Sequence, residues 1–334
     1  MENSIGLGKT DQLNNIEPIE THNNNVGTTE LILEETDNLS EEPEDTKPLG
    51  IGIEEETLPF LEALERPDEL RLSATVEPTI TFAKRCQIGR RARHEDACVA
   101  MATQTGGHFT TMPFGLFVVA DGMGGHKNGH IASKTASRIS ASHILENIYF
   151  PMLKEGNGPP PPIQSVMLDA VASAHRALYD PDPEKDSGTT LSIALVFGKR
   201  VYISHVGDSR VYLHSQNKLT QITTDHSLVQ RLQDVGTISE DDEEAMGSIG
   251  NILLRAVGQG EELEIDAYTR SLPAEGGKLI LCTDGLWGSI PNAKIQEIVE
   301  QDCSLQKLAD DLFEAAFEAG SSDNITVLLV EFNL

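Results

Sequence analysis

Apolar residues in the larger, C-terminal part of the chain gather in short runs separated by turn residues, a pattern that predicts β-strands. The runs start at about Thr79, and no repeat of fixed period connects them. A short polar link joins residues 201–205 to residues 210–214, which predicts antiparallel pairing. The predicted strands are residues 79–82, 116–120, 189–197, 201–205, 210–214, 278–282 and 325–332.

Three segments between and after these runs carry the periodicity of helices. Residues 163–178 and 305–316 place apolar residues three and four positions apart, and Gly320 closes the second segment. Residues 129–148 predict a third helix with isoleucines broadly on one side, namely Ile131, Ile139, Ile144 and Ile148. Because strands and helices cluster rather than strictly alternate, the pattern favours an α+β layered domain over a doubly wound parallel sheet.

The first part of the chain lacks this patterning and carries most of the excess negative charge. The 334 residues hold 25 Lys and Arg against 53 Asp and Glu, a net charge of −28. Residues 1–80 alone hold 20 acidic and 4 basic side chains, a net charge of −16. Such a segment cannot bury enough apolar surface to offset its ordering entropy. Residues 1–75 are therefore predicted to be a largely disordered acidic tail, and residues 76–334 one domain. A short docking element within the tail is the alternative, built on Leu58, Phe60, Leu61, Leu64, Leu70 and Leu72.

Composition excludes several classes of partner. A net charge of −28 gives no general electrostatic attraction to nucleic acid or to an anionic membrane. No apolar run approaches the roughly 18–20 residues that span a bilayer, and the N-terminus does not resemble a secretory signal. The four cysteines form no Cys-x-x-Cys pair, so they predict neither a zinc site nor a disulfide framework. We therefore expect a cytoplasmic protein.

Three aspartates occupy equivalent places relative to the predicted strands. Asp121 and Asp284 each follow an apolar run and precede a glycine, and Asp323 stands just before the last run. A single Asp-Gly pair is most often a turn, but such strand-end positions can converge in space. Grouped carboxylates repel each other unless a hard cation lies between them, and all-oxygen ligands favour Mg²⁺ or Mn²⁺. The pattern thus predicts a metal site.

Two further acidic elements are candidates for the same chemistry. Arg91 lies shortly before Glu95 and Asp96, a grouping that sets a forked donor for a tetrahedral oxyanion beside two carboxylates. Taken alone, it more often marks a surface charge cluster. Asp208 lies between two predicted strands, where a hairpin turn is the alternative. The segments that imitate a phosphate-binding loop or a cysteine phosphatase motif do not have the residue spacing that those motifs require. Metal-activated water is the nucleophile that remains.

Taken in order, these motifs resemble the metal-dependent protein phosphatase 2C family of Ser/Thr phosphatases, and its bacterial branch in particular. The resemblance runs from about Thr79 to Phe332. The motifs that carry it are Arg91…Glu95-Asp96, Asp121-Gly122-Met123-Gly124-Gly125-His126, Ser187-Gly188-Thr189-Thr190, Gly207-Asp208-Ser209-Arg210, Thr224-Asp225-His226-Ser227-Leu228-Val229, Arg255-Ala256-Val257-Gly258, Thr283-Asp284-Gly285-Leu286-Trp287 and Ser322-Asp323-Asn324-Ile325-Thr326.

The resemblance implies a four-layer α-β-β-α sandwich of two antiparallel sheets, with a dinuclear Mn²⁺ or Mg²⁺ site at one end. Glu95 and Asp96 would support the metals and their waters, and Arg91 would bind the substrate phosphate. Water activated by the metals would attack phosphorus in line, without a phosphoenzyme. Residues 233–251 would form a flap that influences substrate choice. The metal ligands implied are the carboxylates of Asp121, Asp284 and Asp323 and the carbonyl of Gly122.

Two positions depart from the family pattern. Gly288 stands where the resemblance leads us to expect an acidic residue that, with Asp208, would hold a third and weaker metal. We therefore expect the third site to be weakened. Met123 stands where some members carry a histidine as the leaving-group acid. His126 is the candidate substitute, and packing against the following helix is an equal alternative for it.

For function, the resemblance implies a monomeric phosphatase that acts on phosphoserine and phosphothreonine in phosphorylated proteins and opposes a Ser/Thr kinase. Two alternatives stay open from the sequence. One is a phosphatase of anti-sigma-factor antagonists in partner switching, and the other is a catalytically weak, phosphatase-like binding module. Because all four primary metal-site positions are present, we favour the enzyme.

Overall fold

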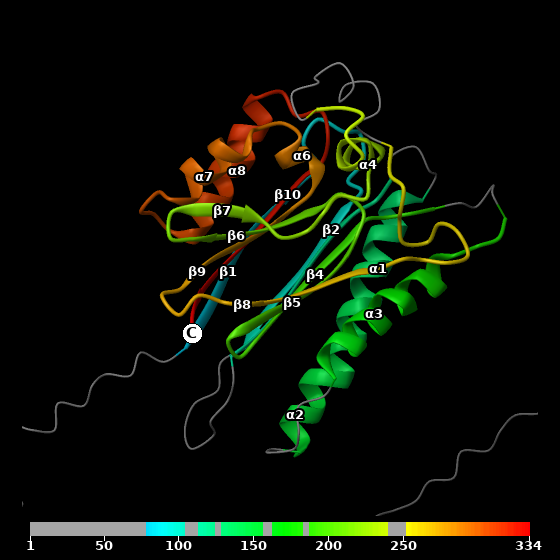
Figure 1. The fold of residues 1–334 in the computed structure, drawn as a ribbon, viewed down its shortest axis with the longest axis horizontal. Coiled ribbons are helices and arrows are strands. Elements are labelled where there is room, and N and C mark those ends of the chain that lie inside the picture. Colours follow the sequence, from blue (N-terminus) through cyan, green and yellow to red (C-terminus); the bar gives the residue numbers. More distant parts are fainter. Residues whose placement is uncertain (1–77, 104–112, 124–127, 156–161, 183–186, 240–251) are drawn as a thin grey trace, which may run out of the picture. The chain divides into compact units, whose positions relative to one another are not determined.

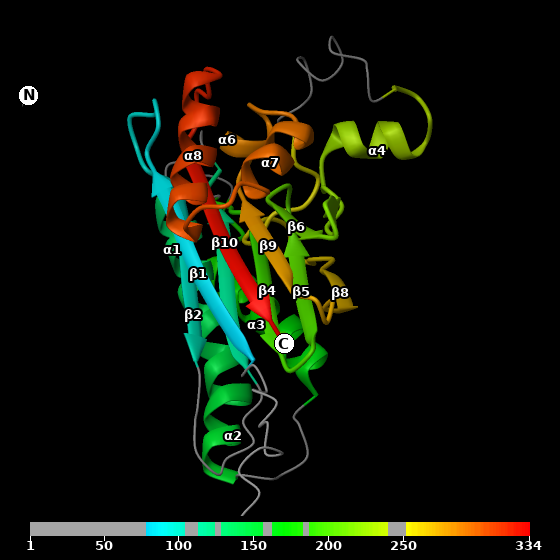
Figure 2. The same ribbon diagram turned by 90° about the vertical axis from the view of Figure 1, so that its left-hand side faces the viewer.

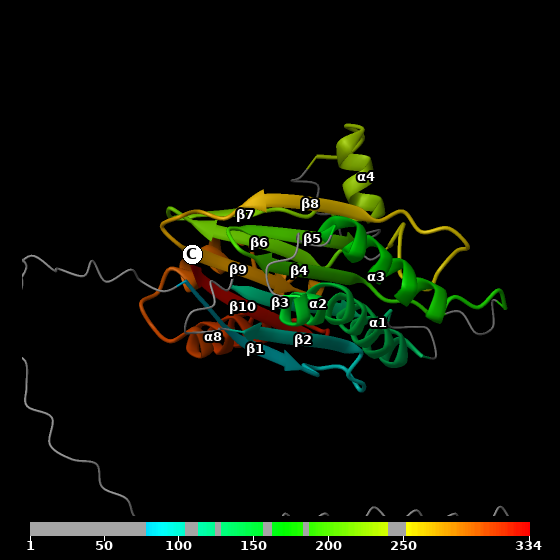
Figure 3. The same ribbon diagram turned by 90° about the horizontal axis from the view of Figure 1, so that it is seen from below.

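Two five-stranded antiparallel sheets pack face to face in the described domain (Figures 1 and 3). This computed structural model describes residues 78–103, 113–123, 128–155, 162–182, 187–239 and 252–334, all within the unit Arg71–Leu334. Three predictions therefore lie outside the described residues. They concern the tail of residues 1–75, residues 240–251 of the flap, and His126.

Each sheet has its own set of strands, and every strand pair is antiparallel. The first sheet has the order β1 (Thr79–Gln87), β10 (Ile325–Asn333), β9 (Gly277–Cys282), β6 (Arg210–Ser215) and β7 (Lys218–Gln221). The second sheet has the order β2 (Asp96–Thr103), β3 (Phe114–Asp121), β4 (Leu191–Phe197), β5 (Arg200–Val206) and β8 (Asp266–Ser271).

Helices cover the outer face of each sheet (Figure 3). None of the helices in the described ranges has the length and apolar character needed to cross a membrane. The second sheet is covered by α1 (Gly129–Ile144) and α3 (Ile163–Leu178), with the π-helical η2 (Leu145–Tyr149) and α2 (Phe150–Glu155) continuing α1. The first sheet is covered by α7 (Asn292–Val299) and α8 (Leu305–Glu318), and the short helices are α4 (Leu228–Asp234) and α6 (Asp284–Trp287).

Apolar side chains fill three layers, and these layers hold the sandwich together. One cluster lies between α1, α3 and the second sheet, one lies between the two sheets, and one lies between the first sheet and α7 and α8. Central strands such as β3 are buried on both faces, which explains their continuous apolar runs. The predicted α+β, four-layer α-β-β-α fold is confirmed.

One predicted strand pairing is wrong. Residues 201–205 and 210–214 lie in β5 and β6, but these strands belong to different sheets. The link between them crosses from one sheet to the other, and Gly207 takes a φ of +104° there. A Cβ atom at Gly207 would lie 2.6 Å from the Thr190 side chain. The short spacing predicted a hairpin because the sequence of a link does not show to which sheet each of its two strands belongs.

Three strands escaped the sequence prediction, and all three are edge strands: β2, β7 and β8. Most residues of β2 and β8 are only partly buried. An edge strand that faces solvent on one side needs no continuous apolar run. The apolar signal therefore located the strands of the sheet interiors and the edge strand β1.

The face that α1 buries also differs from the predicted one. Ile131 is 50% exposed, so the row of isoleucines does not form a single buried side. The buried face consists mainly of small residues, namely Gly129, Ala132, Ser133, Ala136, Ser137, Ser140 and Ala141. Two of its serines donate back to the helix, Ser137 to the Ser133 carbonyl at 2.8 Å and Ser140 to the Ala136 carbonyl at 2.6 Å. Because these side chains are small and their hydroxyls are hydrogen-bonded, α1 packs closely against both the second sheet and α3.

A buried histidine on β5 makes the stability of the fold depend on pH. His205 is fully buried, its Nε2 donates to the Thr224 carbonyl at 3.1 Å, and its Nδ1 lies 2.9 Å from the Ser192 hydroxyl. Burial, and then the neighbouring His226, lowers the pKa of His205 to about 3. The folded state therefore keeps this ring neutral at pH values where the unfolded chain binds a proton.

We predict that His205 weakens the folded state as the pH falls below the unfolded pKa of about 6.5. Near pH 5.5 the unfolded chain binds nearly one more proton than the folded one, which costs about 1 kcal/mol of unfolding free energy per pH unit. Urea unfolding of wild type and His205→Asn between pH 5 and 7.5 measures this slope. The slope should be smaller in the variant, and equal slopes would contradict the assignment.

Candidate active site

Carboxylates from separate strands meet at one end of the sandwich. Asp121 is the last residue of β3, and the strand register places it opposite Asp96, the first residue of β2. Asp284 begins α6 one residue after the end of β9, and Asp323 stands just before β10. The sandwich therefore brings together four aspartates that are widely separated along the chain.

Burial and mutual repulsion raise the pKa values of these carboxyl groups. Burial, followed by the charges of Asp96 and Asp284, raises the pKa of Asp121 well above its ordinary value. Burial, followed by the charge of Asp323, raises the pKa of Asp284 to about 6. Carboxylates influence each other this strongly only when they share one poorly solvated site. They form one electrostatic cluster that favours a bound cation.

Two oxygens of this cluster, Asp96 Oδ1 and Asp284 Oδ1, are buried and have no hydrogen-bond partner among the described residues. The other oxygen of Asp96, Oδ2, accepts from the Thr326 hydroxyl at 2.6 Å and the Thr283 hydroxyl at 3.0 Å. The side chain is therefore fixed while Oδ1 stays unpaired. A buried carboxylate oxygen without a partner is costly, and a hard divalent cation fits its chemistry.

Arg91 pairs with one carboxylate of the cluster. Its Nη2 lies 2.5 Å from Asp323 Oδ2, and this hydrogen bond raises the pKa of the guanidinium. In the described part of the chain, no three His, Cys, Asp or Glu side chains are grouped closely enough to hold a metal ion. The carboxylates nevertheless supply oxygen donors of the type that a hard cation prefers, and a cation would compete with Arg91 for Asp323.

An asparagine fixes the loop that carries Arg91 and Glu95. The side chain of Asn324 donates to the Ile88 carbonyl at 2.7 Å and to the Arg93 carbonyl at 2.9 Å. Its Oδ1 accepts from the Glu95 backbone N–H at 2.7 Å. Because Asn324 directly follows Asp323, the same turn positions the loop and the carboxylate. The Asp-Asn pair thus orders both sides of the site.

The turn after β3 is held by close backbone packing. The Gly122 N–H donates to the Glu95 carbonyl at 3.1 Å, and the Asp121 N–H donates to the Thr190 hydroxyl at 2.9 Å. A Cβ atom at Gly122 would lie 2.2 Å from the Gly129 carbonyl oxygen, so only glycine fits. The Ser187-Gly188-Thr189-Thr190 motif therefore frames this turn rather than contributing a charged group.

Asp208 lies on the link between β5 and β6 and is buried. Burial, followed by the charge of Asp284, raises the pKa of Asp208 to about 8. Asp208 therefore belongs to the same electrostatic cluster. Gly288 ends α6 on the wall of the site, where a Cβ atom would lie 2.8 Å from the Asp284 carbonyl oxygen.

A cleft of about 810 Å³ opens directly beside the cluster. Arg91, Asp284 and Asp323 line one part of it, and other parts are lined by residues in and just before α4 and by residues from α6 to the start of α7. Apart from Arg210 and Asp225, the lining away from the cluster is largely uncharged and polar, with Gln221, Ser227, Gln230, Gln233, Ser289 and Asn292. The acidic cluster and Arg91 therefore face a space large enough for a peptide segment.

Comparison with known proteins identifies this arrangement. The family model described as protein phosphatase 2C matches residues 88–329. The serine/threonine phosphatase stp of Listeria welshimeri is 37% identical over 225 residues, which cover 66% of this chain and 85% of that protein. The chain belongs to the protein phosphatase 2C family.

Solved structures agree with this assignment. The Mycobacterium tuberculosis serine/threonine phosphatase PstP/Ppp is 30% identical with a TM-score of 0.62, covering 75% of this chain and 98% of that chain. The catalytic domain of the serine threonine protein phosphatase PstP, solved in complex with 2 manganese ions, also has 30% identity and a TM-score of 0.62. It covers 76% of this chain and 99% of that chain. The chain is a PP2C-type serine/threonine protein phosphatase, and thus a hydrolase.

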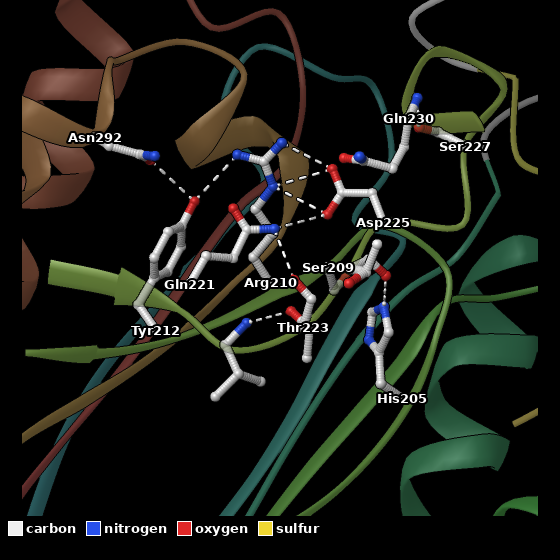
Figure 4. Close-up of polar contacts among 12 residues, drawn as sticks. His205, Ser209, Arg210, Tyr212, Gln221, Thr223, Asp225, Ser227, Gln230 and Asn292 are labelled. Carbon is white, nitrogen blue, oxygen red and sulfur yellow. Dashed lines mark hydrogen bonds and ion pairs between the residues drawn. The ribbon is translucent and has the colours of Figure 1, made fainter. Parts of the chain in front are cut away.

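The wall of the phosphatase cleft contains an ion pair to which the sequence analysis gave no role (Figure 4). Arg210 donates from Nε to both carboxylate oxygens of Asp225 at 3.1 Å and from Nη2 to Oδ2 at 2.7 Å. Its guanidinium carbon lies 3.6 Å from the centroid of the Trp287 ring. Arg210 Nη1 also donates to the Tyr212 hydroxyl, which donates to Asn292. This network ties β6, α6 and α7 together in the wall of the cleft.

The charges of this pair are balanced locally, unlike those of the acidic cluster. Arg210 has several partners, and Asp225 also accepts from the Gln221 amide at 3.2 Å. A fully partnered pair needs no added ion. Both residues lie in motifs noted in the sequence. The sequence does not show, however, that two residues 15 positions apart form a bidentate pair.

Proposed function

We propose that this phosphatase hydrolyses phosphoserine and phosphothreonine in proteins at a divalent-cation site built on Asp121, Asp284, Asp323 and the Gly122 carbonyl. The observation that carries the proposal is a carboxylate cluster with two unpaired buried oxygens that opens into the same cleft as Arg91. Dependence on a divalent metal is supported by family membership and by the manganese-bound PstP structure. Two ions, either Mn²⁺ or Mg²⁺, are part of the proposal.

The bound cations would supply a water of lowered pKa as nucleophile and neutralise the negative charge that develops on the phosphoryl group. Arg91 would bind the phosphoryl oxygens through its forked N–H donors, since its partly exposed guanidinium lies at the cleft. Its pairing with Asp323 places it at the site when no cation is bound, and a cation that binds Asp323 would free these donors for the substrate.

Asp96 and Glu95 would act as supporting groups. The hydroxyls of Thr283 and Thr326 fix Asp96, so its unpaired Oδ1 is held in place to accept from a water. Glu95 is fixed through its backbone, which donates to Asn324 and accepts from Gly122. His126 is proposed as the acid that protonates the leaving group.

We predict that Asp284→Asn lowers turnover of a phosphothreonine peptide by at least about 100-fold, because even supporting groups of metal sites contribute 10–100-fold. A matched control is Asp302→Asn, which removes an exposed charge between α7 and α8. Wild-type turnover should vanish with a chelator and return with Mn²⁺. Retained turnover in Asp284→Asn would contradict the site, and no chelator-sensitive turnover in folded wild type would favour a binding module.

Asp208 would contribute to a third and weaker cation site, for which Gly288 provides no side-chain ligand. We predict that Gly288→Asp lowers the Mn²⁺ or Mg²⁺ concentration needed for half-maximal activity. A Cβ atom at this position crowds the Asp284 carbonyl, so Gly288→Ala controls for that effect. An unchanged metal dependence in Gly288→Asp relative to Gly288→Ala would contradict a weakened third site.

We further propose that the substrates are cytoplasmic proteins phosphorylated by an opposing Ser/Thr kinase, and that the enzyme acts as a monomer. The polar cleft beside the cluster supports a peptide substrate. The Asp284→Asn variant can be used to capture phosphorylated proteins from a lysate. The captured proteins distinguish a phosphatase of kinase substrates from the partner-switching alternative. Retention of kinase substrates supports the proposal, whereas selective retention of an anti-sigma-factor antagonist supports the alternative.

A further inference from the structure

Two cysteines lie against each other at the edge where the two sheets meet. Cys86 lies on β1 of the first sheet and Cys98 lies on β2 of the second, and these strands run side by side (Figures 2 and 3). Lys84, two residues before Cys86 on β1, reaches Cys98 Sγ with its Nζ at 3.9 Å, and both cysteine side chains are only partly buried. The two thiols therefore face the same edge between the sheets, close to solvent.

The surroundings give the two thiols different reactivity. Lys84 Nζ lies 3.9 Å from Cys98 Sγ, and an ammonium at this position stabilises a thiolate. The neighbouring Cys86, together with Lys84, lowers the pKa of Cys98, and the neighbouring Cys98, together with burial, raises the pKa of Cys86. Because the Lys84 ammonium contacts Cys98, Cys98 is the attacking sulfur and Cys86 its neighbouring partner.

A bound soft metal is a different use of two adjacent cysteines. His94 Nε2 lies 3.7 Å from Cys86 Sγ, so nitrogen and sulfur donors are both present. The Cys86 thiol, however, also contacts the Thr326 hydroxyl, and Cys98 contacts the Lys84 ammonium, a cation that would repel a metal ion. The arrangement therefore favours thiol chemistry over metal binding.

One hydroxyl connects this thiol pair to the acidic cluster. The register of β1 and β10 places Cys86 opposite Thr326. The Thr326 hydroxyl lies 3.1 Å from Cys86 Sγ and 2.6 Å from Asp96 Oδ2. Cys98 stands two residues after Asp96, so both side chains lie on the same face of β2. A change at the sulfur atoms would reach Asp96 along two short routes.

We propose that Cys86 and Cys98 are a modification site, at which a hydroperoxide forms a reversible disulfide that weakens activation of the phosphatase by metal. The Cys98 thiolate attacks the hydroperoxide, an alcohol leaves, and Cys98 becomes a sulfenic acid. Cys86 then attacks the Cys98 sulfur and water leaves, which forms the S–S bond. The two thiols lose two electrons and two protons, and the hydroperoxide is reduced to alcohol and water.

The S–S bond would join the two sheets at the strand that begins with Asp96. It would draw Cys86 Sγ away from the Thr326 hydroxyl and alter how that hydroxyl holds Asp96. This consequence rests on the proposed function, because it assumes that Asp96 supports a bound cation. A change in a group that supports a metal site typically costs about 10-fold or more in affinity or activity.

The first test follows the bond itself and is independent of catalysis. The full chain is treated with hydrogen peroxide, alkylated, and mapped by mass spectrometry with and without dithiothreitol. We expect a linked peptide pair containing Cys86 and Cys98, lost after reduction and absent from Cys86→Ser and Cys98→Ser. Cys303→Ser removes an exposed thiol elsewhere and should keep the link. Absence of the link in peroxide-treated wild type would overturn the proposal.

The second test measures the Mn²⁺ concentration needed for half-maximal turnover of a phosphothreonine peptide. Oxidised wild type should need about 10-fold more Mn²⁺ than reduced wild type, and Cys98→Ser should show no such change. A formed link without a change in the Mn²⁺ requirement would overturn the regulatory role. Absence of turnover in reduced wild type would instead contradict the proposed function, and the mass measurement distinguishes the two failures.

Discussion

Repulsion among carboxylates that share one partly buried cleft is the constraint on which the rest of this site depends. Asp96, Asp121, Asp208, Asp284 and Asp323 come from separate strand ends and links, and burial with mutual repulsion raises several of their pKa values. Without a cation, such a cluster keeps protons or engages Arg91. A hard cation removes the repulsion and satisfies unpaired oxygens at once. The proposed metal chemistry follows from this single electrostatic imbalance.

Apart from Arg91, which pairs with Asp323, the fold holds the cluster with neutral groups rather than with opposite charges. The hydroxyls of Thr190, Thr283 and Thr326 and the amide of Asn324 orient the acidic turns from both sheets. These neutral groups fix the geometry and leave most of the negative charge uncompensated. The Arg210–Asp225 pair shows the opposite arrangement, because its charges are balanced within the wall of the cleft. The same end of the sandwich therefore contains one balanced network and one site that still favours a cation.

Sequence reasoning located the strand interiors and the acidic strand ends for a clear physical reason. Strands buried on both faces must be apolar throughout, so a polar residue at their end stands out, as Asp121 does after β3. The edge strand β2 has no such signal, although it carries Asp96 and Cys98. The pairing of β5 with β6 was wrong because a short link can equally cross between sheets. Contacts such as Arg210 with Asp225, or Cys86 with Cys98, depend on how strands meet in space, which local spacing does not encode.

The most direct test of the central claim is where a divalent cation binds. Crystals of the full chain grown with Mn²⁺ and measured near the manganese absorption edge locate the ion by its anomalous scattering. We predict anomalous peaks among the carboxylates of Asp121, Asp284 and Asp323, with Arg91 released from Asp323. This prediction would be contradicted by a folded protein with saturating Mn²⁺ in which the cluster shows no anomalous peak and the Arg91–Asp323 pair is unchanged.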